Sequence, residues 1–253
     1  MNIISLVNQK GGVAKTTTAV CLGSLLAELG SKVLVVDLDA QGNLTENFGI
    51  NGDEIDNTIY EVLTQDLPLK QAIHTTEFGV DIIPSNINLA SAELDIANKM
   101  SREMILRRAF KKADLDYDFV ILDLPPSLGL ITLNSLALSN YVLIPVDAGV
   151  YSLSGINQLV KIITTVIEND LNDDLSVLGV LLTKADDRIN VTKDIQDTLR
   201  DMFGDKLFNT YIHHNSKILE SQRDHKPINY FDKKSRGYLE YKELAKEVIE
   251  RVK

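Results

Sequence analysis

Two lysines and a pair of glycines near the start of the chain have the spacing of a phosphate-binding loop. Residues 7–18 follow an apolar run of strand length, residues 3–7, and precede a helical pattern over residues 19–29. Glycines let backbone N–H groups point at phosphate oxygens, which side chains would block. Lys15 can place a positive charge on the β- and γ-phosphates, and the Thr16 hydroxyl can ligate Mg²⁺. The segment therefore predicts nucleotide chemistry.

The loop departs from the common pattern G-x-x-x-x-G-K-[ST], because Gln9 and Ala14 stand at its two glycine positions. It fits K-G-G-x-x-K-[ST], in which Lys10 precedes the glycines. On this motif the chain resembles the deviant Walker A ATPases, which include ParA-type partition ATPases and the division-site regulator MinD. The resemblance implies that Lys10 reaches across a dimer interface to the partner's nucleotide. A left-handed backbone at alanine costs roughly 1–2 kcal/mol, so we expect a negative φ at Ala14.

The resemblance also assigns contacts with ATP or ADP along the loop. Lys10 and Lys15 are expected to act in catalysis, and Thr17 is expected to donate to an inner phosphate. The nucleotide contacts that the resemblance implies in this loop are Lys10, Gly11, Gly12, Val13, Ala14, Lys15, Thr16 and Thr17.

Two carboxylates follow the next predicted strand, residues 33–37. Asp37 and Asp39 stand where parallel strands of an open α/β sheet meet their ligands. By resemblance, D-x-D-x-Q-G-N over residues 37–43 is the family's first switch. Asp39 would then position the attacking water, and Asp37 would lie near the metal's water shell. Without the upstream loop, an Asp-rich turn after a strand would be the simpler interpretation.

A second apolar run, residues 117–123, also ends in a carboxylate, Asp123. This is the Walker B arrangement, in which the carboxylate holds Mg²⁺ through water, although many strands end in Asp. The following D-x-P-P-S-L-G resembles the family's second switch. We therefore expect the metal side of the site to consist of Thr16, Asp37 and Asp123, with residues 125–129 sensing the γ-phosphate.

Residues 183–188 read T-x-x-D-x-R and resemble a family segment near the nucleotide base. The resemblance adds Thr183 and Asp186 to the expected nucleotide contacts. By itself the motif is weak, and a polar loop leading into a helix is the alternative.

Composition limits the class of protein. With 253 residues, 44% hydrophobic and 25% charged, the chain fits a single ATPase domain over residues 1–253. It has no run of 18 apolar residues and no signal-peptide pattern, which predicts a cytoplasmic protein. Cys21 is the only cysteine, so an intrachain disulfide is impossible. A shared iron–sulfur cluster, as in the related nitrogenase iron protein, is also disfavoured.

Strand-like runs alternate with helical patterns along the whole chain. This alternation predicts an α/β fold with a doubly wound, mainly parallel sheet and helices on both faces. The further strands are expected at residues 80–84, 141–146 and 177–182, and helices at 58–63, 89–110, 153–167 and 238–252. The last helix is amphipathic, but glutamates share its polar face with lysines. We therefore expect it to pack onto the core and not onto a membrane.

Positive charge gathers at the C-terminal end, although the chain carries a net charge of −10. Residues 216–253 hold ten Lys or Arg against seven Asp or Glu, a balance of +3. Relatives commonly read I-P-R-N where this chain has Ile212, His213, His214 and Asn215, so one basic contact is replaced. We interpret the two histidines as a surface pair whose protonation would favour DNA binding near pH 6 over pH 8. The expected DNA contacts are Lys217, Arg223, Lys233, Lys234 and Arg236.

Together the motifs predict a slow, Mg²⁺-dependent ATP hydrolase of the ParA type. The resemblance implies an ATP-dependent homodimer that binds DNA nonspecifically, associates with the nucleoid, and is released when a ParB-like centromere-binding partner stimulates hydrolysis. A MinD-like switch that positions cargo on a membrane or a protein scaffold is the alternative. A nucleotide-dependent regulator with negligible turnover is a third interpretation.

Overall fold

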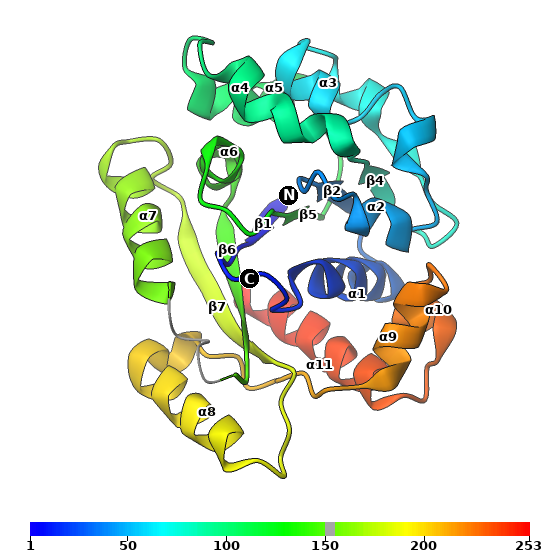
Figure 1. Ribbon diagram of the computed structural model, residues 1–253, viewed down its shortest axis with the longest axis vertical. Helices are drawn as coiled ribbons and strands as arrows, with labels where there is room; N and C mark the ends of the chain where they lie inside the picture. Colours follow the sequence, from blue (N-terminus) through cyan, green and yellow to red (C-terminus); the bar gives the residue numbers. More distant parts are fainter. Residues whose placement is uncertain (150–154) are drawn as a thin grey trace.

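A seven-stranded sheet forms the centre of the molecule in the computed structural model, which describes residues 1–149 and 155–253 (Figure 1). The strand order is β3-β4-β2-β5-β1-β6-β7. All neighbouring strands are parallel except β3, which pairs antiparallel with β4. The strands are β1 (Asn2–Leu6), β2 (Val33–Asp37), β3 (His74–Thr75), β4 (Asp81–Ile83), β5 (Phe119–Asp123), β6 (Tyr141–Asp147) and β7 (Ser176–Thr183).

Each central strand is apolar on both faces because helices cover both sides of the sheet. In β2, Val33 and Val35 join one core cluster while Leu34 and Val36 join the other. This alternation follows from the two-residue period of a strand. The expectation of a doubly wound α/β sheet is therefore confirmed.

Two layers of helices enclose the sheet. Helices α1 and α11, with α9 and α10 beside them, cover one face, and α3 to α8 contribute to the core on the other. The α-helices are α1 (Lys15–Glu28), α2 (Asn43–Asn47), α3 (Ile59–Thr64), α4 (Ala92–Ile96), α5 (Ile105–Ala113), α6 (Leu130–Leu138), α7 (Ile156–Glu168), α8 (Asn190–Phe203), α9 (Ser216–Arg223), α10 (Ile228–Phe231) and α11 (Arg236–Arg251). The short 3₁₀ helices are η1 (Gly52–Glu54), η2 (Leu69–Ala72), η3 (Ile87–Ser91), η4 (Arg102–Met104) and η5 (Gly204–Lys206).

The long helix expected over residues 89–110 is wrong, because η3, α4, η4 and α5 occupy this region as separate turns. Ser101 adopts a left-handed backbone with φ 49°, which ends any continuous helix. The Asn134 side chain then fixes the bend, since it donates to the carbonyl of Arg102 and accepts from the N–H of Leu106. A tertiary hydrogen bond therefore overrides the local helical pattern.

The helices expected at 153–167 and 238–252 correspond to α7 and α11. The start expected for the helix at 153–167 lies outside the described residues, which resume at Gly155 before α7. Helix α11 packs onto α1 and buries Tyr241, Leu244 and Val248, so its expected place on the core is confirmed. No helix in the described part of the chain is long and apolar enough to cross a membrane.

The sheet brings acidic strand ends together. Asp37 at the end of β2 is the register partner of Asp123 at the end of β5, and Asp123 also pairs with Leu6 at the end of β1. The loop between β1 and α1 therefore emerges beside both carboxylates. This is the edge of an open α/β sheet where ligands bind.

Candidate nucleotide-binding site

A cavity of about 820 Å³ lies at this edge of the sheet, which is a volume suited to a nucleotide-sized ligand. One side, called the phosphate side below, consists of Gly11, Gly12, Ala14, Lys15, Thr16, Thr17 and Asp39. The opposite side, called the far wall, includes Thr183, Lys184, residues 212–215 and α9 residues such as Ile218 and Gln222. The cavity thus joins the first loop of the chain to segments some two hundred residues later.

Helix α1 begins directly at the phosphate side. Ala14 is its N-cap residue and supplies no side-chain cap, and no described side chain accepts a hydrogen bond from the first turn. The free N–H groups and the positive end of the helix dipole favour an anion at this position. The first turn of α1 is therefore suited to hold phosphate oxygens.

The negative φ expected at Ala14 is wrong. Ala14 has φ 66° and ψ 32°, in the left-handed region. Its carbonyl accepts from the N–H of Thr18, so this residue must turn the chain directly into the first turn of the helix. Gly12 is also left-handed, with φ 75°. Left-handed residues at alternate positions orient successive N–H groups inward. At Ala14 this conformation raises the conformational free energy, because the Cβ atom crowds the backbone.

Lys15 places its ammonium in the interior of this loop. Its side chain is almost fully buried, and Nζ lies 3.4 Å from the carbonyl oxygen of Lys10. Burial lowers the pKa of Lys15, although the charges of Asp123 and Asp39 oppose the shift. A buried cation held this loosely is placed to bind an anionic ligand.

The paired carboxylates Asp37 and Asp123 have opposite environments. Asp37 accepts hydrogen bonds from the N–H of Asp39 at 3.1 Å and from the N–H and hydroxyl of Thr45 at 2.9 and 2.7 Å. Both carboxylate oxygens of Asp123 are buried, yet no described residue donates a hydrogen bond to them. The Thr16 hydroxyl lies nearby without meeting hydrogen-bond geometry.

These environments shift both acids in the same direction. Burial raises the pKa of Asp37 to about 6, against the hydrogen bonds from Thr45 and Asp39. Burial also raises the pKa of Asp123 well above its usual value, and the negative charge of Asp37 adds to the effect. An ionised Asp123 is therefore costly until a cation arrives.

The residues at this point fit a magnesium ion. Mg²⁺ binds carboxylates, hydroxyls, waters and substrate phosphates, and Asp123 beside Thr16 supplies the first two kinds of ligand. Asp37 already uses its oxygens on protein donors, so its expected place near the metal's water shell stays a prediction. Within the described ranges no group of three or more His, Cys, Asp or Glu side chains could hold a metal by itself. A bound Mg²⁺ would need the nucleotide phosphates as further ligands.

Lys10 faces away from the cavity lining. Its ammonium donates to both carboxylate oxygens of Asp147, at 2.8 and 2.9 Å. Asp147 ends β6 and was missed by the sequence analysis. The signal was present, because this strand is a third apolar run that ends in Asp.

Asn8 also escaped the sequence analysis. Its buried amide donates to the carbonyl of Pro145 at 2.7 Å, and its oxygen accepts from the N–H of Lys10 at 2.9 Å. It therefore fastens the start of the loop to β6. A buried asparagine next to a glycine-rich loop is the signal that could have identified it.

The remaining expected nucleotide contacts lie at different depths. The buried Val13 offers its carbonyl to the Thr183 hydroxyl at 3.1 Å, which joins the loop to the far wall. The Thr17 hydroxyl accepts from Gln222 of α9 at 2.8 Å. Asp186 is absent from the cavity lining and pairs with Arg188 at 2.7 Å. Its contact with a nucleotide therefore stays a prediction.

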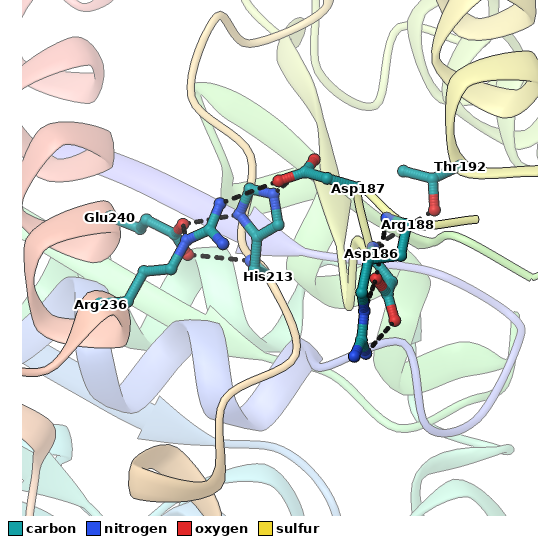
Figure 2. A network of polar contacts seen from close by, with 7 residues as sticks. All are labelled: Asp186, Asp187, Arg188, Thr192, His213, Arg236 and Glu240. Carbon is teal, nitrogen blue, oxygen red and sulfur yellow. Dashed lines mark hydrogen bonds and ion pairs between the residues drawn. The ribbon is translucent and has the colours of Figure 1, made fainter. Parts of the chain in front are cut away.

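The interpretation of His213 and His214 as a surface pair is wrong for the first of them. His214 is exposed, whereas His213 is 7% exposed and lies between Glu240 and Asp187 (Figure 2). Residues 212–214 run parallel to the chain at Ala185, with which Ile212 and His214 form backbone hydrogen bonds. One of two neighbouring side chains on such an extended segment must then face inward.

Comparison with known proteins identifies the family. Residues 1–177 match the family model described as AAA domain. The chain is 42% identical over 247 residues to the sporulation initiation inhibitor protein Soj of Bacillus subtilis, covering 97% of each. It is 40% identical over 250 residues to the chromosome partitioning protein ParA of Myxococcus xanthus, covering 98% of this chain and 88% of that protein. The chain belongs to the ParA-type partition ATPases.

A solved structure supports the same assignment for the fold. Cobyrinic acid a,c-diamide synthase from Mycobacterium smegmatis, with bound ATP analogue and magnesium, superposes with a TM-score of 0.87 at 34% identity. The match covers 100% of this chain and 96% of that one. This ParA-type chain therefore has the architecture of a P-loop ATPase, with its loop and the start of α1 at the cavity.

Proposed function

We propose that this protein is a DNA-partition ATPase consisting of a single nucleotide-binding domain. The observation that carries the proposal is the phosphate side of the cavity. There the first turn of α1 and the buried ammonium of Lys15 lie near the carboxylate of Asp123, and among the described residues neither the first turn nor Asp123 has a hydrogen-bonding side-chain partner. Phosphate oxygens and Mg²⁺ would provide the partners that these groups lack.

In the proposed complex the loop amides of Gly11, Gly12, Val13 and Ala14 surround the phosphates, and Lys15 neutralises the charge that develops on them. Thr16 and Asp123 would hold Mg²⁺, which would draw charge away from the γ-phosphate. Asp39 lines the cavity and has one carboxylate oxygen occupied by the N–H of Gln41. Its other oxygen is available to orient the attacking water.

ATP would join two subunits face to face. In this dimer Lys10 leaves Asp147 and reaches the partner subunit's phosphates. The ion pair in the monomer supports this proposal, because it holds Lys10 ordered but outside its own cavity. Exchange of one carboxylate partner for a phosphate is electrostatically inexpensive compared with burying a free ammonium.

The dimer would bind DNA without sequence preference through α9, α10 and the start of α11, which contact one another. The positive side chains there are exposed, but most carry an acidic neighbour. Lys217 pairs with Glu220, Arg223 with Asp224, Lys233 with Glu28, and Arg236 with Glu240 and Asp187. Lys234 is exposed with no ion pair to another described residue. It is therefore the cleanest probe of a phosphate contact.

Release from the nucleoid would follow when a ParB-like centromere-binding partner stimulates hydrolysis. The similarity to Soj and to ParA of Myxococcus xanthus supports this role. A product of a neighbouring gene with a helix-turn-helix motif is the first partner to test in an ATPase assay.

The decisive experiment measures DNA retention by Asp39→Ala protein with ATP and Mg²⁺, across a salt series, together with its mass by light scattering. We expect an ATP-dependent dimer that holds DNA and releases it steeply as salt rises. Lys234→Glu should weaken retention without reducing basal ATP hydrolysis, while Lys111→Glu on α5 serves as the control of equal charge change. Arg236→Glu should weaken retention as well. An ATP-bound dimer that ignores DNA at low salt would favour the positioning-switch alternative.

A further inference from the structure

Helix α9 presents one of its faces to the nucleotide cavity. The residues of α9 that line the cavity are Ile218, Leu219, Gln222 and Arg223, which form two pairs four residues apart and therefore lie on one side of the helix. From this face the amide nitrogen of Gln222 donates to the hydroxyl of Thr17 at 2.8 Å. The two residues are 205 positions apart in the sequence. This hydrogen bond therefore joins the far wall to the first turn of α1.

The place of Gln222 is fixed by contacts at the start of α9. The Asn215 side chain caps the helix. Ile218, one turn before Gln222, packs so closely against Gly237 of α11 that a Cβ atom at Gly237 would lie 2.8 Å from two carbons of the Ile218 side chain. Because α9 is held at this point, Gln222 approaches Thr17 from a well-anchored helix.

The direction of the hydrogen bond decides what the Thr17 hydroxyl can do next. A hydroxyl has one hydrogen to donate and two lone pairs that accept. Gln222 donates to a lone pair, so the hydrogen of Thr17 stays available. None of the described residues accepts a hydrogen bond from this hydroxyl. Because Thr17 lines the cavity, an anionic oxygen bound there would be a strong acceptor for it.

We propose that Gln222 is a positioning residue for phosphate binding: it orients the Thr17 hydroxyl so that its hydrogen donates to a phosphate oxygen of the nucleotide. This inference rests on the proposed nucleotide site. Gln222 acts through Thr17 and not by touching the phosphate itself. Without the amide, the hydroxyl can rotate, and backbone carbonyls of α1 compete for its hydrogen. A ligand would then lose binding free energy in reorienting the hydroxyl.

A double-mutant cycle tests this role. Gln222→Leu removes the amide but keeps a side chain of similar bulk, and Thr17→Val removes the hydroxyl but keeps its shape. ADP affinity in the presence of Mg²⁺ is measured by titration calorimetry for the parent, both single variants and the double variant. Gln222→Leu should weaken ADP binding about three- to tenfold in the parent, the range for one neutral hydrogen bond, and less than about twofold in the Thr17→Val background.

Gln222→Glu tests the direction of the hydrogen bond. An ionised carboxylate only accepts, so it would draw the Thr17 hydrogen away from the cavity. This variant should weaken ADP binding more than Gln222→Leu does. Part of its loss should disappear in the Thr17→Val background, and the part that remains is repulsion between the carboxylate and the phosphates. Gln196→Leu on α8 makes the matched change outside the cavity lining and should keep the parental affinity.

Three results would overturn the role of Gln222. They are unchanged ADP affinity in Gln222→Leu, tighter binding in that variant, and equal losses in the parent and Thr17→Val backgrounds. Equal losses would mean that Gln222 supports the fold of α9 or touches the ligand directly. Urea unfolding shows that each variant is folded under the conditions of the titration. If the parent protein binds no ADP, the proposed function fails and this inference with it, whereas additive losses in a protein that binds ADP contradict only the role of Gln222.

Discussion

The charged groups near the phosphate side and near the far wall of the cavity differ in whether protein groups satisfy them. Beneath the phosphate side, Asp123 keeps two buried oxygens without a hydrogen-bond donor among the described residues, and Lys15 on that side makes one long contact. At the far wall, His213 lines the cavity and contacts Glu240 and Asp187 behind it, and Arg236 pairs with both acids. These acids therefore have protein partners without a ligand. Unsatisfied buried charge lowers stability, so it persists where a ligand supplies the missing partner. Charged groups that already have protein partners, like those at the far wall, instead hold their segments in position.

Removal of Lys15 should give the largest effect. Lys15→Ala is expected to weaken nucleotide binding about a hundredfold or more, because no other lysine or arginine lines the phosphate side. Titration calorimetry with ADP and ATP measures this loss. Lys10→Ala is the matched control, since Lys10 pairs with Asp147 and should leave binding by the monomer intact. Retained affinity in Lys15→Ala would remove the loop from the site.

Substitution of Asp39 tests whether this residue acts in hydrolysis without contributing to nucleotide binding. Asp39→Ala should stop ATP hydrolysis while ATP binding and dimerisation persist, because the carboxylate can reach water without ligating the metal. Single-turnover hydrolysis and nucleotide binding are measured on the same sample, with Asp53→Ala in η1 as the surface control. Hydrolysis at the parental rate would mean that another group orients the water.

Asp123 and Asp37 compare an unsatisfied carboxylate with a satisfied one directly. Asp123→Asn should stabilise the nucleotide-free protein by about 1–3 kcal/mol, because it removes a buried negative charge, and should abolish stabilisation by Mg²⁺ with ATP. Asp37→Asn should instead destabilise the protein, since an amide nitrogen would face the donors of Thr45. Urea unfolding with and without Mg-ATP measures both. Destabilisation by Asp123→Asn would show that this carboxylate has a protein partner.

Glu28 is a satisfied charge on the opposite end of α1. Burial would raise its pKa, but hydrogen bonds from Tyr238, Lys233 and Lys242 outweigh burial and lower the pKa to about 2. Its contribution to stability is therefore complete above pH 4.5 and is lost as the pH falls from 4.5 toward 2. Glu28→Gln should flatten the unfolding free energy in that window, by up to about 2 kcal/mol. The exposed Glu77→Gln is the control, and unchanged acid sensitivity in Glu28→Gln would contradict the assignment.

Ala14 should give the smallest effect. Ala14→Gly removes left-handed strain but adds entropy to the unfolded chain, so a net gain of about 0.5–1 kcal/mol is expected. Ala19→Gly within α1 has no strain to relieve and should cost about 1 kcal/mol or more. Thermal unfolding of the pair measures the difference. Equal destabilisation by both substitutions would mean that the alanine is not strained.

Local patterns were sufficient to predict the elements of the phosphate side. Each motif is one continuous stretch of sequence: a strand run that ends in Asp37, another that ends in Asp123, and a glycine loop before α1. The residues on either side of each motif therefore indicate the strand or helix to which it belongs. The parallel sheet follows from strand–helix alternation, because such a crossover returns each strand in the same direction. Register then places the acidic ends side by side.

The tertiary structure decided which of these groups have partners. Thr45 satisfies Asp37 from eight residues along the chain. Asp147, 137 residues away, holds Lys10, and Asn134, 32 residues from Arg102, breaks the helix expected over residues 89–110. The left-handed turn at Ala14 also arose from tertiary need, because the loop must bring its amides to one point. His213 was interpreted as part of a surface pair, but Glu240 and Asp187 approach it from 27 and 26 residues away. Contacts between distant segments depend on packing, and packing is the property that a local sequence pattern does not contain.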